Sequence, residues 1–389
     1  MEPFDLVFPT HIHFGPGIVD RTGDYVHPLA TRVLVVTGSF ALSSGLFARI
    51  EEQLKRRRCT VISGAPVTPN PSYDEVTALA RQVNEQDIEC ILAVGGGSVI
   101  DVAKITAGLL LSGDAQRFWE DHFLNYQSVE RALPIVAVPT IPASGSETSD
   151  AAVISDSKTG KKLIASGPAL VPRCALLDPT LTVTLSPRQT ACGISDMLSH
   201  LNERYFTPVK ETHLTDQLLE AVMRYVIEAG PLVLANPTSL ALRSQIMWAG
   251  TLAHSTLLDR GRGGGDWACH MIEHALSAFS DVEHGAGLAI LTPAWIRFIG
   301  PFHPAPIARY AQQVWGCTAR SSDALLDGVA EALFSFYRIL GLPTRLREIG
   351  IERAQLPAIA ELACPAAHTI GSLHPLDSSQ VEEILSIAF

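Results

Sequence analysis

The hydrophobic positions in the first half of the chain form short uninterrupted runs that alternate with amphipathic stretches. Strand-like runs cover residues 32–37, 60–63, 90–94 and 134–138. Helical patterns cover residues 43–57, 73–84 and 98–111. A short apolar run bounded by turn residues is typical of a buried strand. Strand and helix alternating through short links predict βαβ units and a parallel sheet. Shorter extended pieces are expected within 151–178, around the turn residues 156–160.

The pattern changes after residue 184. From Pro187 onward helical periodicity dominates to the end of the chain, punctuated by glycine and proline. We therefore predict an α/β domain over residues 1–184 that binds a dinucleotide, and an all-helical domain over residues 185–389. A chain of 389 residues is long enough for each of two domains to bury its own core.

Composition narrows the class of protein. The net charge of −11 argues against a nucleic-acid partner or an anionic membrane surface, since both require a basic patch. The seven cysteines are scattered, odd in number and never spaced as CxxC, which favours a reducing compartment. The N-terminus lacks the features of a signal peptide, and no apolar run reaches transmembrane length. We expect a cytoplasmic protein.

Two loops of small residues are candidates for ligand binding. Gly95-Gly96-Gly97-Ser98 directly follows the third strand, and Ser98 with Asp101 resembles a capping box. Glycine lets a ligand approach the backbone, and a helix N-terminus attracts anions, so a pyrophosphate would fit there. The loop does not match G-x-G-x-x-G, and a tight turn explains the same glycines. The second loop, 140–148, follows the fourth strand and supplies hydroxyls, as an ordinary polar loop also would.

Histidine spacing in the second half points to metal chemistry. Asp196 and His200 are four residues apart, and so are His270 and His274, which places each pair on one face of a helix. Three imidazoles and one carboxylate suit Zn²⁺ or Fe²⁺. His254 and His284 lie in the same region. A lone histidine is more often structural, and spacing alone does not decide which of these rings are ligands.

Taken in order, the segments 95–104, 139–147, 196–203 and 270–285 resemble the iron-containing (group III) alcohol dehydrogenases. Residues 263–274 are most similar to the butanol dehydrogenase-like branch. The resemblance spans nearly the whole chain. It implies a Rossmann-like N-terminal domain, an α-helical C-terminal domain and a cleft between them. It also implies hydride transfer between NAD or NADP and a small primary alcohol or aldehyde, with one divalent metal ion, iron or zinc, as Lewis acid. We expect a homodimer.

The resemblance also assigns residues. The matching metal ligands are Asp196, His200, His270 and His284. His274 matches a histidine that lies near the substrate and is not a ligand, so we expect it to relay a proton. The positions matching nicotinamide-cofactor contacts are Asn70, Gly96, Gly97, Ser98, Asp101, Thr140 and Lys162.

Two departures from the family pattern affect the cofactor site. Pro142 and Ser144 stand where members more often have a small residue and threonine, which changes the nicotinamide pocket without removing its loop. Members that prefer NAD often carry aspartate after the first strand, where this chain has Gly38 followed by Ser39. An aspartate there would repel the 2′-phosphate of NADP. We therefore expect NADP to work at least as well as NAD.

Two other interpretations compete with this one. Dehydroquinate synthase-like lyases share the architecture and use NAD and a divalent metal, but their anionic substrate requires several basic residues. The segment 240–290 has only Arg243, Arg260 and Arg262. A non-catalytic protein braced by a metal is the other alternative, since four protein ligands also close a structural zinc site. Steady NAD(P)H oxidation with an aldehyde separates it from the enzyme.

Overall fold

The computed structural model describes residues 1–365 and 368–389, which divide into two compact units. The first, called the α/β unit here, comprises Val7–Thr184 and Arg243–Thr251. The second, called the helical unit, comprises Met1–Leu6, Leu185–Leu242 and Leu252–Phe389.

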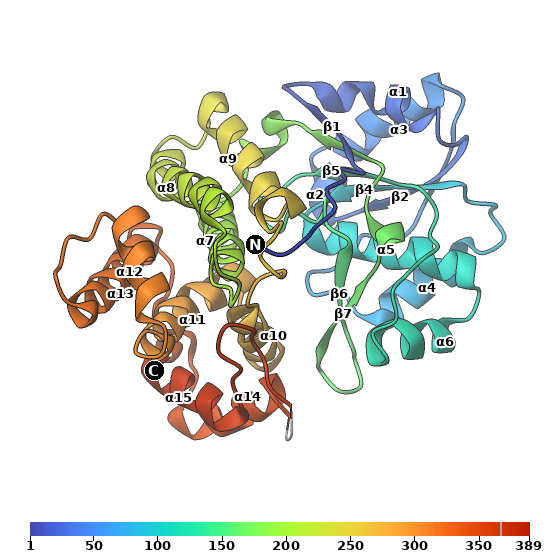
Figure 1. Cartoon of the computed structure of the whole chain (residues 1–389). Coiled ribbons are helices and arrows are strands. Elements are labelled where there is room, and N and C mark those ends of the chain that lie inside the picture. The colour runs from blue at the N-terminus through green and yellow to red at the C-terminus, as the bar shows by residue number, and fades with distance from the viewer. Residues whose placement is uncertain (366–367) are drawn as a thin grey trace. The chain divides into compact units, whose positions relative to one another are not determined.

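A six-stranded parallel sheet in the order β1-β8-β5-β4-β2-β3 forms the centre of the α/β unit (Figure 1). Its strands are β1 (His11–Phe14), β2 (Arg32–Thr37), β3 (Thr60–Ser63), β4 (Cys90–Gly95), β5 (Ile135–Pro139) and β8 (Cys174–Leu177). Strands β4 and β5 are buried along their whole length. Their sequences are apolar on both sides because helices cover both faces of the sheet.

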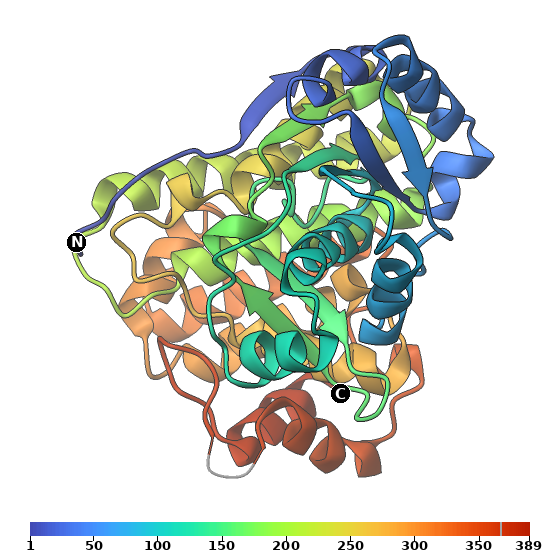
Figure 2. The same cartoon turned by 90° about the vertical axis from the view of Figure 1, so that its right-hand side faces the viewer.

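Two hydrophobic cores lie on the two faces of this sheet. Alternate residues of β2 divide between them, so that Leu34 packs on one side and Val35 on the other. Helices α4 (Tyr73–Val83), α5 (Gly97–Ser112) and α6 (Ala115–Trp119) cover the Leu34 side and pack beside one another (Figures 1 and 2). Helices α1 (Thr22–Val26) and α3 (Leu46–Arg56) cover the Val35 side.

A small antiparallel hairpin completes the α/β unit. It consists of β6 (Ala151–Ser155) and β7 (Lys162–Ser166), and β6 packs against α5. The extended pieces expected within 151–178 are therefore this hairpin together with β8. Strand β1, at the edge of the sheet beside β8, was not among the predicted strands.

The helical unit is organised around α11 (His284–Ile299), which packs against four other helices. These four are α7 (Pro187–Tyr205), α10 (Ala268–Ser280), α13 (Ser322–Ile339) and α15 (Ser378–Ala388). The remaining α-helices are α8 (His213–Ala235), α12 (Pro304–Gln313) and α14 (Leu356–Ala363), while α9 (Leu240–Ala253) is shared between the units. The predicted parallel α/β fold followed by helices is confirmed. None of the helices in the described chain is both long and apolar enough to cross a bilayer.

Two predicted helix starts are wrong. The helix expected from residue 43 is divided into α2 (Ser39–Ser43) and α3, because Gly45 adopts φ 76° between them. The predicted cap at Ser98 is also displaced. Helix α5 begins at Gly97 with Gly96 as its N-cap, so Ser98 is already helical and caps nothing.

Candidate functional site

Helix α7 carries the first half of the histidine cluster. A capping box between Ser186 and Gln189 starts the helix, and almost every side chain after its first turn is buried. Asp196 and His200, each 5% exposed, lie one turn apart on one face of α7, and Glu203 follows one turn later. The helix therefore presents a carboxylate, an imidazole and a second carboxylate in a row inside the helical unit.

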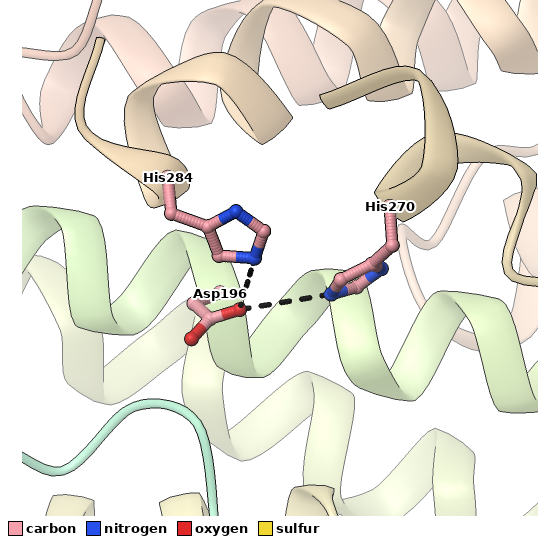
Figure 3. A group of neighbouring side chains, drawn as sticks. All are labelled: Asp196, His270 and His284. Atoms are coloured by element: carbon pink, nitrogen blue, oxygen red, sulfur yellow. Dashed lines mark ion pairs between the residues drawn. The ribbon is translucent and has the colours of Figure 1, made fainter. Parts of the chain in front are cut away.

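Helices α10 and α11 bring two more imidazoles to Asp196. His270 is the third residue of α10, and His284 is the first residue of α11. Gly285 allows this approach, because a Cβ atom there would lie 2.1 Å from the carbonyl oxygen of Cys192 on α7. Figure 3 shows the rings of His270 and His284 directed at the same carboxylate oxygen.

The distances within the cluster match ligands of a shared metal better than hydrogen bonds. Asp196 Oδ1 lies 3.6 Å from His200 Nδ1, 3.8 Å from His270 Nε2 and 3.6 Å from His284 Nε2. These separations exceed ordinary hydrogen-bond lengths. Donor atoms arranged tetrahedrally at about 2.1 Å from one metal ion are about 3.4 Å apart.

Three of these four atoms are buried without hydrogen-bond partners in the part of the chain that the structure describes. Asp196 Oδ1, His200 Nδ1 and His270 Nε2 accept or donate no hydrogen bond within the described chain. Three such atoms in one cluster are unusual, because buried polar groups are nearly always satisfied. A bound cation would satisfy them, so this cluster fits a metal ion. Asp196, His270 and His284 each offer one donor atom within 4.8 Å of the others, a group that does not include His200.

Two buried glutamates, which the sequence reasoning missed, support the imidazoles. Glu203 Oε1 accepts hydrogen bonds from the backbone N–H of His270 at 2.9 Å and pairs with His270 Nδ1 at 3.1 Å. Glu273 Oε2 pairs with His284 Nδ1. The available signal for Glu203 was its position, three residues after His200 on the same face of α7.

The pKa values of His200 and His270 are shifted in opposite directions. Burial, followed by the neighbouring rings of His254 and His270, holds the pKa of His200 well below its usual range, so the ring is neutral. Burial also lowers the pKa of His270, but the carboxylates of Asp196 and Glu203 outweigh it and raise this pKa to about 9. A metal ion at Nε2 would displace that proton, because only neutral imidazole binds metals.

The rings of His254 and Trp267 pack against the imidazoles of the candidate metal ligands. The ring of His254 stacks on His200 with centroids 4.3 Å apart, and Trp267 meets the His270 ring edge-on at 5.2 Å. Trp267 has φ 67°, an uncommon conformation for a bulky residue. Its indole Nε1 donates to Gly264 O at 2.6 Å, which fixes the ring orientation.

His274 lies one turn after His270 and is half-buried. Its ring centroid is 5.6 Å from that of His284. It stands outside the Asp196 group but forms a second group with Glu273 and His284, again with donor atoms within 4.8 Å. His274 therefore neighbours the candidate ligands.

In the α/β unit, the loops after β2, β4 and β5 meet at one edge of the sheet. The chain leaves β2 toward β3 and returns on the other side of β2 to β4, so the strand order reverses between β2 and β4. Ligands of open α/β sheets bind outside the carboxyl ends of the strands at such a point. Gly38 ends one of these loops as the N-cap of α2, and Gly96 ends another as the N-cap of α5, which begins at Gly97.

At this edge the chain is packed so closely that a larger side chain at Gly96 or Gly97 would require its neighbours to shift. A Cβ atom at Gly97 would lie 2.5 Å from Ser144 Oγ, and one at Gly96 would lie 3.2 Å from Ile141. Thr140, almost fully buried, donates its N–H to Gly95 O at 3.0 Å. The loop after β5 is therefore fitted against the glycine turn.

The other predicted cofactor residues lie around the β6–β7 hairpin. Ser155 pairs with Lys162 in the hairpin, and its hydroxyl donates to Asn70 O at 3.4 Å. Asp101 accepts from the Ser146 hydroxyl at 2.7 Å and from the Val153 N–H at 3.0 Å. Both oxygens of Asp101 thus hold protein segments in place.

Comparisons with known proteins agree over the whole chain. A model described as iron-containing alcohol dehydrogenase matches residues 9–179, and one described as Fe-containing alcohol dehydrogenase family, C-terminal, matches residues 190–389. NADH-dependent butanol dehydrogenase B of Clostridium acetobutylicum is 35% identical over 99% of both chains. NADPH-dependent aldehyde reductase YqhD of Escherichia coli is 33% identical over 92% of both. The crystal structure of NADH-dependent butanol dehydrogenase A from Thermotoga maritima superposes with a TM-score of 0.93 at 31% identity, covering 100% of this chain and 99% of that one.

Proposed function

Because the chain belongs to the iron-containing alcohol dehydrogenase family, we propose that it is a metal-dependent, NAD(P)-dependent alcohol dehydrogenase and aldehyde reductase. Its substrates are small primary alcohols and the corresponding aldehydes, which is supported by a butanol dehydrogenase and an aldehyde reductase among its relatives. The observation that carries the proposal is the cluster of buried atoms without hydrogen-bond partners among the described residues, Asp196 Oδ1, His200 Nδ1 and His270 Nε2.

The helical unit holds the metal in this proposal. Its ligands are Asp196, His200, His270 and His284, supported by their spacings of 3.6–3.8 Å to Asp196 Oδ1. A divalent ion, iron or zinc, supplies a Lewis acid for the substrate oxygen, and the nicotinamide carries the hydride. His274 relays the hydroxyl proton to solvent through its ring, which is half-buried beside His284.

The α/β unit binds the cofactor in this proposal. The N–H groups of Gly96, Gly97 and Ser98 receive the pyrophosphate at the start of α5, a placement supported by the reversal of strand order beside them. Gly38 and Ser39 face the adenosine ribose, and NADP serves at least as well as NAD. The remaining cofactor positions are Asn70, Asp101, Thr140, Ser144 and Lys162.

The lyase alternative is less well supported. Arg262 is 2% exposed and directs its guanidinium at Asp216, Thr212 and the carbonyl oxygens of Arg204 and Tyr205. It therefore braces the helical unit and offers no charge to an anionic substrate. We further propose a cytoplasmic homodimer. All seven cysteines are free thiols, which supports a reducing compartment, and sedimentation measurements test the dimer.

A substrate panel tests the function. The purified protein is assayed for NADPH and NADH oxidation with short straight-chain aldehydes, before chelation, after chelation and after return of Fe²⁺ or Zn²⁺ separately. We expect turnover to follow metal content and His270→Ala to abolish it while the helical circular dichroism remains. Full turnover by protein shown to be metal-free by elemental analysis would overturn the proposal.

A further inference from the structure

Two carboxylates stand behind the imidazoles of His270 and His284. Each engages the Nδ1 atom of one ring, Glu203 that of His270 and Glu273 that of His284. In both rings the other nitrogen, Nε2, lies within 3.8 Å of Asp196 Oδ1. The same relation thus occurs twice, from glutamates on two different helices.

This arrangement determines which nitrogen can bind a cation. A ring that donates Nδ1–H to a carboxylate keeps its lone pair on Nε2 and cannot rotate away without breaking that bond. The backbone N–H of His270 donates to the same oxygen of Glu203, so that oxygen is held in position by α10 itself. Both Nε2 atoms are consequently directed toward Asp196.

Stability alone does not explain the two glutamates. They are 2% and 0% exposed, and Glu203 Oε2 and Glu273 Oε1 have no hydrogen-bond partner among the described residues. A buried carboxylate with half of its oxygens unsatisfied destabilises a fold. The chain also makes room for Glu273, because a Cβ atom at Gly287 would lie 2.8 Å from its Cγ. The free energy lost by burying these two carboxylates is offset if a cation binds on the Nε2 side of the His270 and His284 rings.

His200 is held differently. It is the Nδ1 atom of this ring that lies 3.6 Å from Asp196 Oδ1, and no carboxylate contact to its other nitrogen is seen in the described chain. Its ring is stacked between those of His254 and His270 instead, with centroids 4.3 and 4.7 Å away. Carboxylate support therefore distinguishes His270 and His284 within the cluster.

We propose that Glu203 and Glu273 are positioning residues for the metal, which fix His270 and His284 with Nε2 toward it and strengthen both rings as ligands. The inference rests on the proposed metal-dependent function. It concerns metal affinity in the first place, and catalysis only through the metal.

Metal affinity of the folded protein tests the inference. Chelator competition measures the dissociation constants for Zn²⁺ and Co²⁺ in the wild type and in Glu203→Gln, Glu203→Ala, Glu273→Gln and Glu273→Ala. We expect the alanine variants to bind about 10–100-fold more weakly, the usual effect of losing a carboxylate behind a ligand histidine. The glutamine variants keep an acceptor oxygen without its charge, so their loss is smaller. The visible spectrum of bound Co²⁺ should change in the alanine variants.

Glu220→Gln is the matched control. Glu220 is a buried glutamate of the same unit, 2% exposed, whose partners are Tyr205 and Arg309. It should keep wild-type metal affinity even where its melting temperature falls. If an alanine variant does not fold, the metal affinity of the corresponding glutamine variant tests the inference instead.

Wild-type metal affinity and an unchanged Co²⁺ spectrum in folded Glu203 and Glu273 variants would overturn the inference. Failure of the proposed function gives a different result, in which the wild-type protein itself retains no metal and oxidises no NAD(P)H with aldehydes.

Discussion

At the scale of single residues, His274 shares helix α10 with a candidate ligand without belonging to the Asp196 group. If it relays a proton, His274→Ala should lower kcat by roughly 10²–10⁴-fold and alter the pH profile, while the metal stays bound. Elemental analysis and pH-dependent kinetics measure the two effects. His213→Ala, at a side chain that is 74% exposed in the same unit, should change neither. Loss of the metal from His274→Ala would mean that His274 is itself a ligand.

A second residue-scale prediction concerns Gly38 and cofactor choice. Gly38 has φ −91° and ψ 170°, an extended conformation open to any residue, and a Cβ atom would lie 3.3 Å from Val99 Cγ2. Gly38→Asp therefore fits after a small adjustment of Val99. Its carboxylate should bond the ribose hydroxyls of NAD and repel the phosphate of NADP, moving the preference by about 1–3 kcal/mol.

The ratio of kcat/KM for the two cofactors measures this shift. Gly38→Asn is the matched control, because it has the same size and hydrogen-bonding reach without the charge, and should move the ratio less. A wild type strongly selective for NAD, with Gly38→Asp making no difference, would show that this position does not contact the ribose.

Local spacing accounts for the part of the candidate site that could be predicted, and tertiary packing accounts for the part that could not. Helical periodicity paired Asp196 with His200; the same period would also have put Glu203 on that face of α7, but Glu203 was not predicted to belong to the site. The contact between Glu273 and His284 depends on the angle at which α11 meets α10, which no local pattern encodes. The stacking of His254 on His200 likewise joins residues 54 positions apart (200 and 254) and follows only from the fold.

At the scale of elements, the contact between α7 and α11 positions His284. Ala in place of Gly285 would put a Cβ atom 2.1 Å from Cys192 O and 2.6 Å from Cys192 C, both backbone atoms that cannot rotate away. The start of α11 must therefore move, and His284 moves with it. We expect Gly285→Ala to destabilise the protein by about 1–3 kcal/mol, the usual range for overpacking, and to weaken metal binding.

Thermal melting and chelator competition measure these two effects. Gly328→Ala on α13 is the control, since its Cβ atom would meet only the side chain of Cys317, at 3.3 Å. It should cost less stability and leave metal affinity unchanged. Full metal affinity in Gly285→Ala would show that the α7–α11 contact does not position His284.

Helices and strands that have a clear pattern in their own sequence were predicted, and those that depend on distant residues were not. The four predicted strands contain uninterrupted apolar runs, and all four are found in the sheet as β2, β3, β4 and β5. Strand β1 is four residues long and partly exposed, and its partner β8 lies more than 150 positions away, so its pairing of His11 with Cys174 left no mark in the local pattern. The break at Gly45 depends on a single positive φ inside a helical pattern.

At the scale of the whole molecule, the family resemblance drawn from short motifs is confirmed across both halves of the chain. No single motif is decisive, and their order along the chain carries the specificity. The candidate metal ligands belong to the helical unit, whereas every proposed cofactor position belongs to the α/β unit. Each ligand should therefore stabilise its own unit first.

Hydrogen exchange can measure this separation of the two ligands. A ligand that binds only the folded state stabilises it by RT ln(1 + [L]/Kd), about 4 kcal/mol at a thousandfold excess over Kd. Metal added to the chelated protein should slow amide exchange in α7, α10 and the first turn of α11, which carry Asp196, His270 and His284. NADPH should slow exchange in the turn before α5 and in the loop after β5, where backbone N–H groups are expected to contact the cofactor.

In His270→Ala the metal effect should disappear and the NADPH effect remain, because the substituted ring lies in the helical unit and the glycine turn lies in the α/β unit. Metal that protects residues 95–98 and leaves α10 and α11 unchanged would contradict the assignment of the metal to the helical unit.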